Sequence, residues 1–271
     1  MRELTSLRGT KLNTPEAIKK EVVEFYKALM GSSTTSLPVV DRNTMKKGPT
    51  ITYEQGVALC EDVMDEEIWK ALTSIGDDKA PGVDGYNTYF YKKTWSITKD
   101  DMLKAIKEPI ACCTIIYKVI AKVLATRMQK IMAHIISEAE SGFIPGRKID
   151  DNIVLATELV KTYSRQHISP RCMLKIDLQK AYDSVEWIFL EQVPKNLCFP
   201  QKFIQWIMEC VHTVNYTIMV NGETTPPFNA ARGLRQGDPI SPYLFDISME
   251  YLSRCLAEMT SYSLVEGIKN L

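Results

Sequence analysis

The sequence has few of the side chains that bind zinc or build a disulfide framework. Its 271 residues include three His, which lie far apart, and seven Cys without a CxxC pair. Cys112 and Cys113 are adjacent, which is poor geometry for a framework of disulfides. The odd number of Cys and the lack of a signal peptide favour a reducing, intracellular setting, nuclear or cytoplasmic rather than secreted.

The sequence also lacks an excess of either charge and lacks a long hydrophobic run. Lys and Arg number 33, as do Asp and Glu, which argues against a generally basic surface that coats nucleic acid. No apolar run approaches the roughly 18 residues of a membrane-spanning helix, so we expect no membrane partner. The 45% of hydrophobic residues is ordinary for a globular protein, and the length suits one large or two small domains.

The N-terminal region predicts a helical connector. Thr14 is a good N-cap, Pro15 suits the first helical position, and Gly31 is a plausible C-terminal stop. Residues 31–50 are rich in Ser, Thr, Gly and Pro, which indicates a linker or a partly disordered loop. The expected division is a connector at 1–60 and a second domain at 61–271.

Helical periodicity recurs along the second domain. We expect helices at 65–75, 115–136, 153–163, 200–212 and 243–257. Asp65 is the expected cap of the first of these, and Asp150 or Asp151 of the third. The apolar residues expected to face a core are Ile153, Val154, Leu155, Leu159, Val160 and Tyr163 in the third helix, and Phe203, Ile204, Ile207, Met208 and Val211 in the fourth.

A local excess of positive charge lies between residues 102 and 148, which contain eight Lys or Arg and three Glu. Lys118, Lys122 and Arg127 are expected mainly on the polar side of the 115–136 helix. A solvated polar face is the simple interpretation of these charges. A basic groove that binds nucleic-acid phosphates is the more specific one.

A short strand is predicted from Met173 to Leu178 by alternation, which places Lys175 and Asp177 on one face. Ser184 is a good N-cap for a helix that follows a tight turn. Spacing alone favours an Asp177 that caps or pairs with Lys175, although a strand end is also a rigid place for a metal ligand. The strand is expected to pair antiparallel in a small sheet and to leave one edge exposed. The helices expected on one face of this sheet are 115–136, 153–163 and 243–257.

A hairpin and a glycine-containing loop are predicted further along. Tyr216 to Val220 is an expected strand, Asn221-Gly222 is a strong hairpin signal, and Pro226-Pro227 breaks the returning strand. The loop at 232–238 contains two Gly residues, which allow close approach of the backbone to a ligand. Asp238 at its end suits a helix start.

Four stretches, in this order, resemble motifs of reverse transcriptases from non-LTR (LINE-type) retrotransposons, closest to those of plants. They are Lys-Ala-Pro-Gly-Val-Asp-Gly at 79–85, Ser-Gly-Phe-Ile-Pro-Gly-Arg at 141–147, Lys-Ile-Asp-Leu-Gln-Lys-Ala-Tyr-Asp at 175–183, and Gly-Leu-Arg-Gln-Gly-Asp-Pro at 233–239. The resemblance implies an α+β fold, namely a partial right-hand polymerase with a palm and incomplete fingers. It also implies an RNA template and a DNA primer as partners.

The resemblance implies roles for single residues. Asp177 would be catalytic and would bind Mg²⁺ together with the carbonyl of Leu178. Tyr182 would lie under the incoming sugar, and Gln236 and Gly237 would line the nucleotide and template pocket. The cations expected to contact nucleic acid are Arg147, Lys148, Lys118, Lys122 and Arg127.

The sequence departs from the family pattern in two places. The stretches at 175–183 and 233–239 resemble the first and second polymerase motifs of the family. The third family motif carries paired aspartates, and no Asp-Asp follows the 233–239 stretch up to Leu271. Two-metal chemistry needs carboxylates that hold ions roughly 3.5–4 Å apart, and Asp177 alone does not provide them. Asp183 and Asp238 are poor substitutes. Upstream, Glu108 stands where the family has a triphosphate-binding arginine, and the strand before it is missing.

These departures leave three hypotheses for function. The first is a truncated reverse transcriptase (RNA-directed DNA polymerase) domain that is inactive on its own. The second is a non-catalytic nucleic-acid-binding remnant that uses the basic stretch. The third is a non-functional product of a decayed element.

Overall fold

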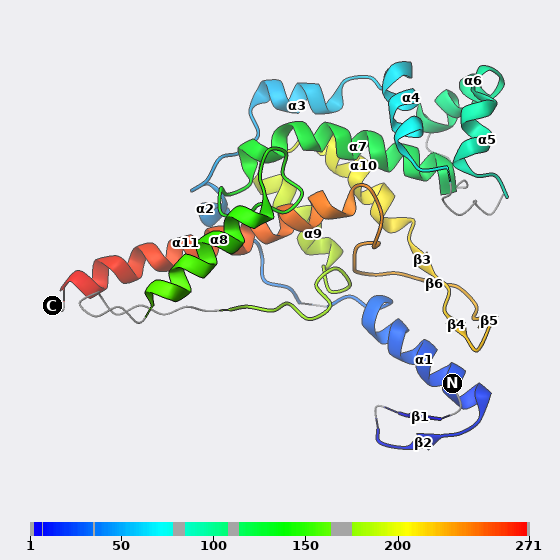
Figure 1. Cartoon of the computed structure of the whole chain (residues 1–271), viewed down its shortest axis with the longest axis horizontal. Coiled ribbons are helices and arrows are strands. Elements are labelled where there is room, and N and C mark those ends of the chain that lie inside the picture. The colour runs from blue at the N-terminus through cyan, green and yellow to red at the C-terminus, as the bar shows by residue number, and fades with distance from the viewer. Residues whose placement is uncertain are drawn as a thin grey trace.

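The computed structural model describes residues 3–6, 8–34, 36–77, 85–107, 114–163 and 175–269, with the side chains of the last helix described as far as Met259. It shows a mainly helical molecule with three two-stranded antiparallel sheets (Figure 1). The helices are α1 (Pro15–Met30), α2 (Arg42–Met45), α3 (Tyr53–Cys60), α4 (Asp65–Ser74), α5 (Thr88–Lys93), α6 (Trp95–Lys107), α7 (Thr114–Ile135), α8 (Ile149–Thr162), α9 (Trp187–Asn196), α10 (Gln201–His212) and α11 (Ser241–Lys269). The strands are β1 (Leu4–Thr5), β2 (Lys11–Leu12), β3 (Asn215–Tyr216), β4 (Met219–Val220), β5 (Glu223–Thr224) and β6 (Phe228–Asn229).

The main core lies between α7, α9, α10 and α11. The five residues predicted to face the core from α10 are all buried, with at most 7% of their surface exposed. Met128 and Met132 of α7, Leu190 of α9 and Leu244 of α11 join them in one apolar cluster. A smaller cluster joins α4 and the first half of α7 through residues such as Ile68 and Val119. Because α7 contributes to both clusters, it is the central element of the fold.

The N-terminal region matches the sequence prediction in α1 and differs in the linker. Thr14 caps α1 and Pro15 is its first residue, as predicted. The sequence predicts a linker or a partly disordered loop over residues 31–50. The described residues of this segment are mostly irregular, but the short helix α2 lies within it, and Val40 and Met45 are buried in the main core. The sequence pattern missed α3, whose Thr52 and Gln55 form a reciprocal capping box.

Three predicted helix starts are displaced. Asp65, Asp150 and Asp151 are not caps but lie in the first turns of α4 and α8, where the helix dipole favours a negative charge. Ser184 is not an N-cap, because residues 179–184 form turns and α9 begins at Trp187. Within the part of the chain that the structure describes, every helix is too short or too polar to cross a membrane.

The predicted strand before the tight turn is wrong as far as the structure describes it. Residues 175–178 have no regular structure and pair with no described strand, so the small sheet with one open edge is not formed there. Ile176 and Leu178, whose alternation suggested the strand, are about half exposed. Alternation indicates a strand only where a neighbouring strand and a covering layer exist. Met173 and Leu174 lie outside the described residues.

The hairpin is confirmed. Val220 pairs with Glu223, and Asn221 and Gly222 both have positive φ, as a two-residue hairpin turn of this kind requires. The expected strand over 216–220 is divided into β3 and β4. The returning strand is likewise divided into β5 and β6 by Pro226-Pro227, as predicted.

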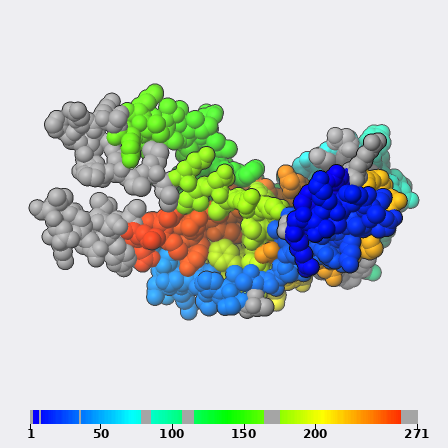
Figure 2. Space-filling view, turned by 90° about the horizontal axis from the view of Figure 1, so that it is seen from below, coloured from blue at the N-terminus to red at the C-terminus, as the bar shows by residue number. Residues whose placement is uncertain are grey.

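Helix α8 exists as predicted, but its expected core face is wrong. All six residues expected to be buried are exposed, and α8 has no buried residue. Figure 2 shows α8 in green, projecting at the end of the molecule where α11 also ends. The periodicity identified an amphipathic helix correctly but predicted a partner that none of the described elements provides.

Candidate polymerase motif site

The backbone joins the turn after Asp177 to the glycine-containing loop. The amide of Leu234 donates to the carbonyl of Tyr182 at 2.8 Å, and the amide of Gly233 donates to the carbonyl of Val185 at 2.8 Å. Gly233 has a φ of +90°, and a Cβ there would lie 3.0 Å from the carbonyl oxygen of Asp183. Only glycine fits both the conformation and the close approach. The two stretches that resemble polymerase motifs are therefore adjacent in the fold.

Side chains strengthen this junction and connect it to α1. Glu186 and Arg232 form an isolated antiparallel bridge, and their side chains form an ion pair at 3.1 Å. The indole of Trp187 donates to the carbonyl of Gly233 at 2.9 Å. The guanidinium of Arg232 also donates to the carbonyl of Leu29, at the end of α1. The helical connector is thus held against the motif junction.

The predicted metal ligand lies outside this junction. Asp177 and Leu178 are exposed in the irregular segment. Nearby, the ammonium of Lys180 lies 4.4 Å from the ring of Phe25 in α1. Among the residues that the structure describes, no three His, Cys, Asp or Glu side chains come close enough to hold a metal ion. The carboxylates that the structure describes around Asp177 therefore do not fit a site for two magnesium ions.

Tyr182 faces α11 and is brought close to a buried carboxyl group. Its ring stacks on that of Phe245, with centroids 4.8 Å apart and planes 11° apart. The adjacent Asp246 is only 8% exposed, and its Oδ2 has no hydrogen-bond partner. Burial raises the pKa of Asp246 to about 7. Burial, with the charge of Asp246 as a smaller cause, also raises the pKa of Tyr182.

A second carboxyl group faces Asp246 from the loop after α7. Burial, followed by the charges of Glu250 and Asp246, raises the pKa of Glu140 to about 7, while Arg147 opposes the rise. The Oδ1 of Asp246 would lie 3.9 Å from a Cβ at Gly142, so the loop packs directly on α11. Sequence reasoning missed both Glu140 and Asp246, because nothing in the local sequence shows that these carboxyl groups are buried.

The second motif places its residues in two environments. Gln236 and Gly237 are exposed at the tip of the loop, and Gly237 has a φ of +80°. Asp238 is buried, accepts a hydrogen bond from the Tyr117 hydroxyl of α7 and accepts another from the amide of Ile240 at 3.2 Å. Burial raises the pKa of Asp238, although these hydrogen bonds oppose the rise. Asp238 therefore organises the start of α11.

Two of the predicted phosphate contacts are used inside the protein. Arg127 is 5% exposed, so its expected place on the polar face of α7 is wrong. It forms two 2.8 Å hydrogen bonds with Glu67 of α4 and donates to the carbonyls of Leu59, Glu61 and Asp62. A guanidinium has five donors in a fixed fork, which explains how one side chain joins α4 to α7 and to the end of α3.

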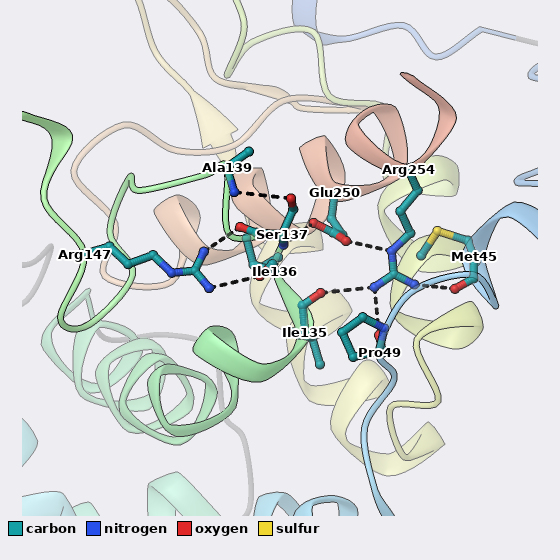
Figure 3. Close-up of polar contacts among 9 residues, drawn as sticks. All are labelled: Met45, Pro49, Ile135, Ile136, Ser137, Ala139, Arg147, Glu250 and Arg254. Atoms are coloured by element: carbon teal, nitrogen blue, oxygen red, sulfur yellow. Dashed lines mark hydrogen bonds and ion pairs between the residues drawn. The ribbon is translucent and has the colours of Figure 1, made fainter. Parts of the chain in front are cut away.

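Arg147 binds the C-terminal end of α7 (Figure 3). Its guanidinium donates to the carbonyl of Ala133 in the last turn of α7 at 3.3 Å. It also donates to the carbonyls of Ile136 at 3.1 Å, Ser137 at 2.5 Å and Glu140 at 2.6 Å, which lie just beyond that turn. The last carbonyls of a helix have no partner within the helix and carry a partial negative charge, so a cation is favoured there. The guanidinium of Arg147 is thus occupied by backbone groups rather than free for phosphate.

Arg254 of α11 approaches the same helix end from the opposite side in Figure 3. It pairs with Glu250 at 2.6 Å and donates to the carbonyls of Met45, Pro49 and Ile135. It therefore holds the segment around α2 against α7 and α11. The other predicted cations differ, because Lys118 and Lys122 are partly exposed and Lys148 is exposed.

A pocket of about 810 Å³ lies between α7 and α10. Tyr117, Ile120 and Leu124 line it from α7, and Trp206 and Cys210 line it from α10. Burial raises the pKa of the Cys210 thiol to about 12, so this thiol is a neutral wall of the pocket. None of the residues predicted to bind a nucleotide lines this pocket.

The chain belongs to the reverse transcriptase (RNA-dependent DNA polymerase) family, which it matches over residues 97–265. It is 24% identical over 89% of its length to an uncharacterized 149 kDa protein of the transposon TX1 of Xenopus laevis. It is 25% identical over 60% of its length to a Pol polyprotein from the retrotransposable element R2DM of Drosophila melanogaster, and 29% over 53% to one from the element R2 of Nasonia vitripennis. These alignments cover 21%, 15% and 14% of the three relatives, so the chain spans about a fifth of their length or less.

Proposed function

We propose that this chain is part of the reverse transcriptase domain of a non-LTR retrotransposon and that the 271-residue polypeptide does not extend a primer on its own. The family match and the relatives from transposable elements support the first part. The palm and fingers arrangement, the division at residue 60, the plant origin and the intracellular location remain predictions.

The observation that carries the proposal is a contrast within the motif site, between the loops that are held together and the exposed Asp177. The backbone bonds between residues 182–185 and 233–234 hold the first and second motifs together, as a nucleotide pocket shared by both would require. Asp177, however, is exposed and is not part of a carboxylate cluster among the described residues. In this proposal Tyr182, Gln236 and Gly237 would shape the pocket. The carboxylate of Asp177 and the carbonyl of Leu178 would each provide a ligand for magnesium. In this family magnesium would assist the attack of the primer hydroxyl on the nucleotide.

The test is template-directed primer extension with purified protein, an RNA template, a DNA primer, nucleotides and magnesium. The expected result is no extension by the wild-type chain and none by the Asp177→Ala variant. Loss of one member of a catalytic unit usually costs orders of magnitude in rate. Extension by the wild type that disappears in Asp177→Ala would show that the chain completes its own metal site and would overturn the proposal.

A second candidate function is salt-sensitive nucleic-acid binding without catalysis. The observation that favours it is the solvent access of Lys118, Lys122 and Lys148, which retain the predicted positive charge after Arg127 and Arg147 are assigned to internal contacts. Three cations that solvent reaches, in a chain without net charge, support weak, sequence-independent binding to phosphates.

A further inference from the structure

Helix α8 carries an apolar stripe that none of the described elements covers. At about 100° per residue, six large apolar side chains fall within roughly 160° of its circumference. Each of the six is between 45% and 61% exposed. They are Ile149, Ile153, Leu155, Leu159, Val160 and Tyr163. An exposed apolar patch of this kind on a protein surface marks an interaction site.

The stripe contains little that would oppose burial. The charged residues of the helix, Asp150, Asp151, Glu158 and Lys161, all lie on the side away from the stripe by the same helical geometry. Lys161 already pairs with Glu158 at 2.9 Å. The polar residue within the stripe is Asn152, whose amide donates to the carbonyl of Ala139 and to the hydroxyl of Ser141. Covering the stripe would therefore bury no charge and leave no amide donor of Asn152 without a partner.

We propose that the α8 stripe, defined by those six residues, is a dimer interface that packs against the α8 stripe of a second copy of this chain. Six side chains that are about half exposed would bury on the order of 600 Å² per copy, or about 1,200 Å² for the pair, which reaches the lower limit of stable interfaces. A two-fold axis perpendicular to the helices would run them antiparallel, so that their dipoles oppose and each stripe meets an identical one. Figure 2 shows α8 at one end of the molecule, away from the N-terminal region.

The first test is the mass of the full chain by sedimentation equilibrium over a concentration series. The expected mass at high concentration is twice the 30.8 kDa of one chain. Leu155→Glu with Leu159→Glu should weaken the dimer about tenfold or more, because two charges would enter the interface. The matched control is Val154→Glu, since Val154 is 62% exposed on the opposite side of the same helix. Far-ultraviolet circular dichroism should show that all the variants keep their helices.

The second test identifies the face of α8 that lies in the dimer. Ala156 lies at the middle of α8 and within the stripe, so Ala156→Cys should form a disulfide with its copy under mild oxidation if the two stripes face each other. Glu158→Cys, on the far side, should not. A chain that stays monomeric at all concentrations would overturn the proposal, as would a dimer that tolerates the double Glu variant. Binding of the wild type to phospholipid vesicles in place of self-association would overturn it too, because the occupant would then be a lipid surface.

Discussion

Helices α10 and α8 have similar amphipathic sequence patterns, but they differ in whether the apolar face is buried. The apolar side of α10 is buried among α3, α7 and α9, whereas the apolar side of α8 is exposed. The comparison shows that periodicity defines which face of a helix is apolar but not whether another element covers it. The packed region around α7 and α10 is therefore separated from an open region that contains α8 and residues 175–180. The predicted metal ligand Asp177 lies in the open region.

The largest expected difference between the two regions is in core stability. Phe203→Ala in α10 should lower the free energy of unfolding by about 3–5 kcal/mol, because it leaves a cavity in a closed core. Leu159→Ala in α8 should change it by no more than about 0.5 kcal/mol, because its side chain is already solvated. Urea denaturation at concentrations where the chain is monomeric measures both. Equal losses would mean that α8 is packed in solution and would break the comparison.

The next contrast concerns two cations on α7. Arg127→Met should lower the free energy of unfolding by about 3 kcal/mol or more, because it leaves Glu67 without its partner and three carbonyls without donors. Lys122→Met, on the partly exposed side of the same helix, is the control and should have a small effect. Thermal and urea unfolding report the difference. A stable Arg127→Met protein with impaired RNA binding would instead support the original prediction of a phosphate contact.

Buried and exposed carboxyl groups should differ in their pH dependence. Asp246 has a pKa of about 7 in the folded state, above its ordinary value, so the folded state holds a proton that the unfolded state releases. Its stabilising contribution is complete below about pH 4 and is lost as the pH rises through 7. The free energy of unfolding should thus fall on the order of 2 kcal/mol between pH 5 and pH 8.

Asp246→Asn should remove the part of this fall that Asp246 contributes, because an amide does not ionise. Glu140, whose pKa is also raised to about 7, should contribute a remaining dependence of the same sign, and Glu250, Arg147, Tyr182 and Tyr243 complete the surroundings. Asp150→Asn, at an exposed position of α8, is the matched control. A wild-type protein whose stability rises from pH 5 to pH 8 would contradict the assignment.

The smallest expected effect is on nucleic-acid binding. A triple variant should weaken the binding of single-stranded RNA and reduce the magnitude of the slope of log affinity against log salt by about 2. Its substitutions are Lys118→Glu, Lys122→Glu and Lys148→Glu. Filter binding across a salt series measures both quantities. Lys20→Glu, at an exposed residue of α1, is the control for a single charge reversal outside this surface and should be compared with Lys148→Glu alone. An affinity that does not vary with salt would rule out the second candidate function.

The sequence was sufficient to predict an element wherever the local signals agree with the packing of the fold. Thr14 and Pro15 start α1, Asn221-Gly222 makes the hairpin turn, and the buried face of α10 follows its periodicity. Family resemblance located the two motif loops, and the structure adds the backbone bonds that join them. The alternation at 175–178 suggested a strand that does not form. A strand depends on partners that lie elsewhere in the chain, and the local pattern does not show whether such partners exist.

The cations show the same limit. Arg127 and Lys122 occupy similar positions in the sequence pattern of α7, yet the first is buried against Glu67 and the second is not. Nothing local distinguishes them, since the distinction depends on where α4 packs. The buried Asp246 was equally hidden, because a carboxylate on an amphipathic helix is usually solvated.

Metal binding tests the proposed function most directly. Manganese can be titrated into the wild-type chain and the Asp177→Ala variant while the electron paramagnetic resonance signal of the free ion is followed. The account predicts the same weak, non-saturating binding for both proteins, because the described carboxylates form no cluster around Asp177. Stoichiometric, saturable binding by the wild type that is lost in Asp177→Ala would contradict it.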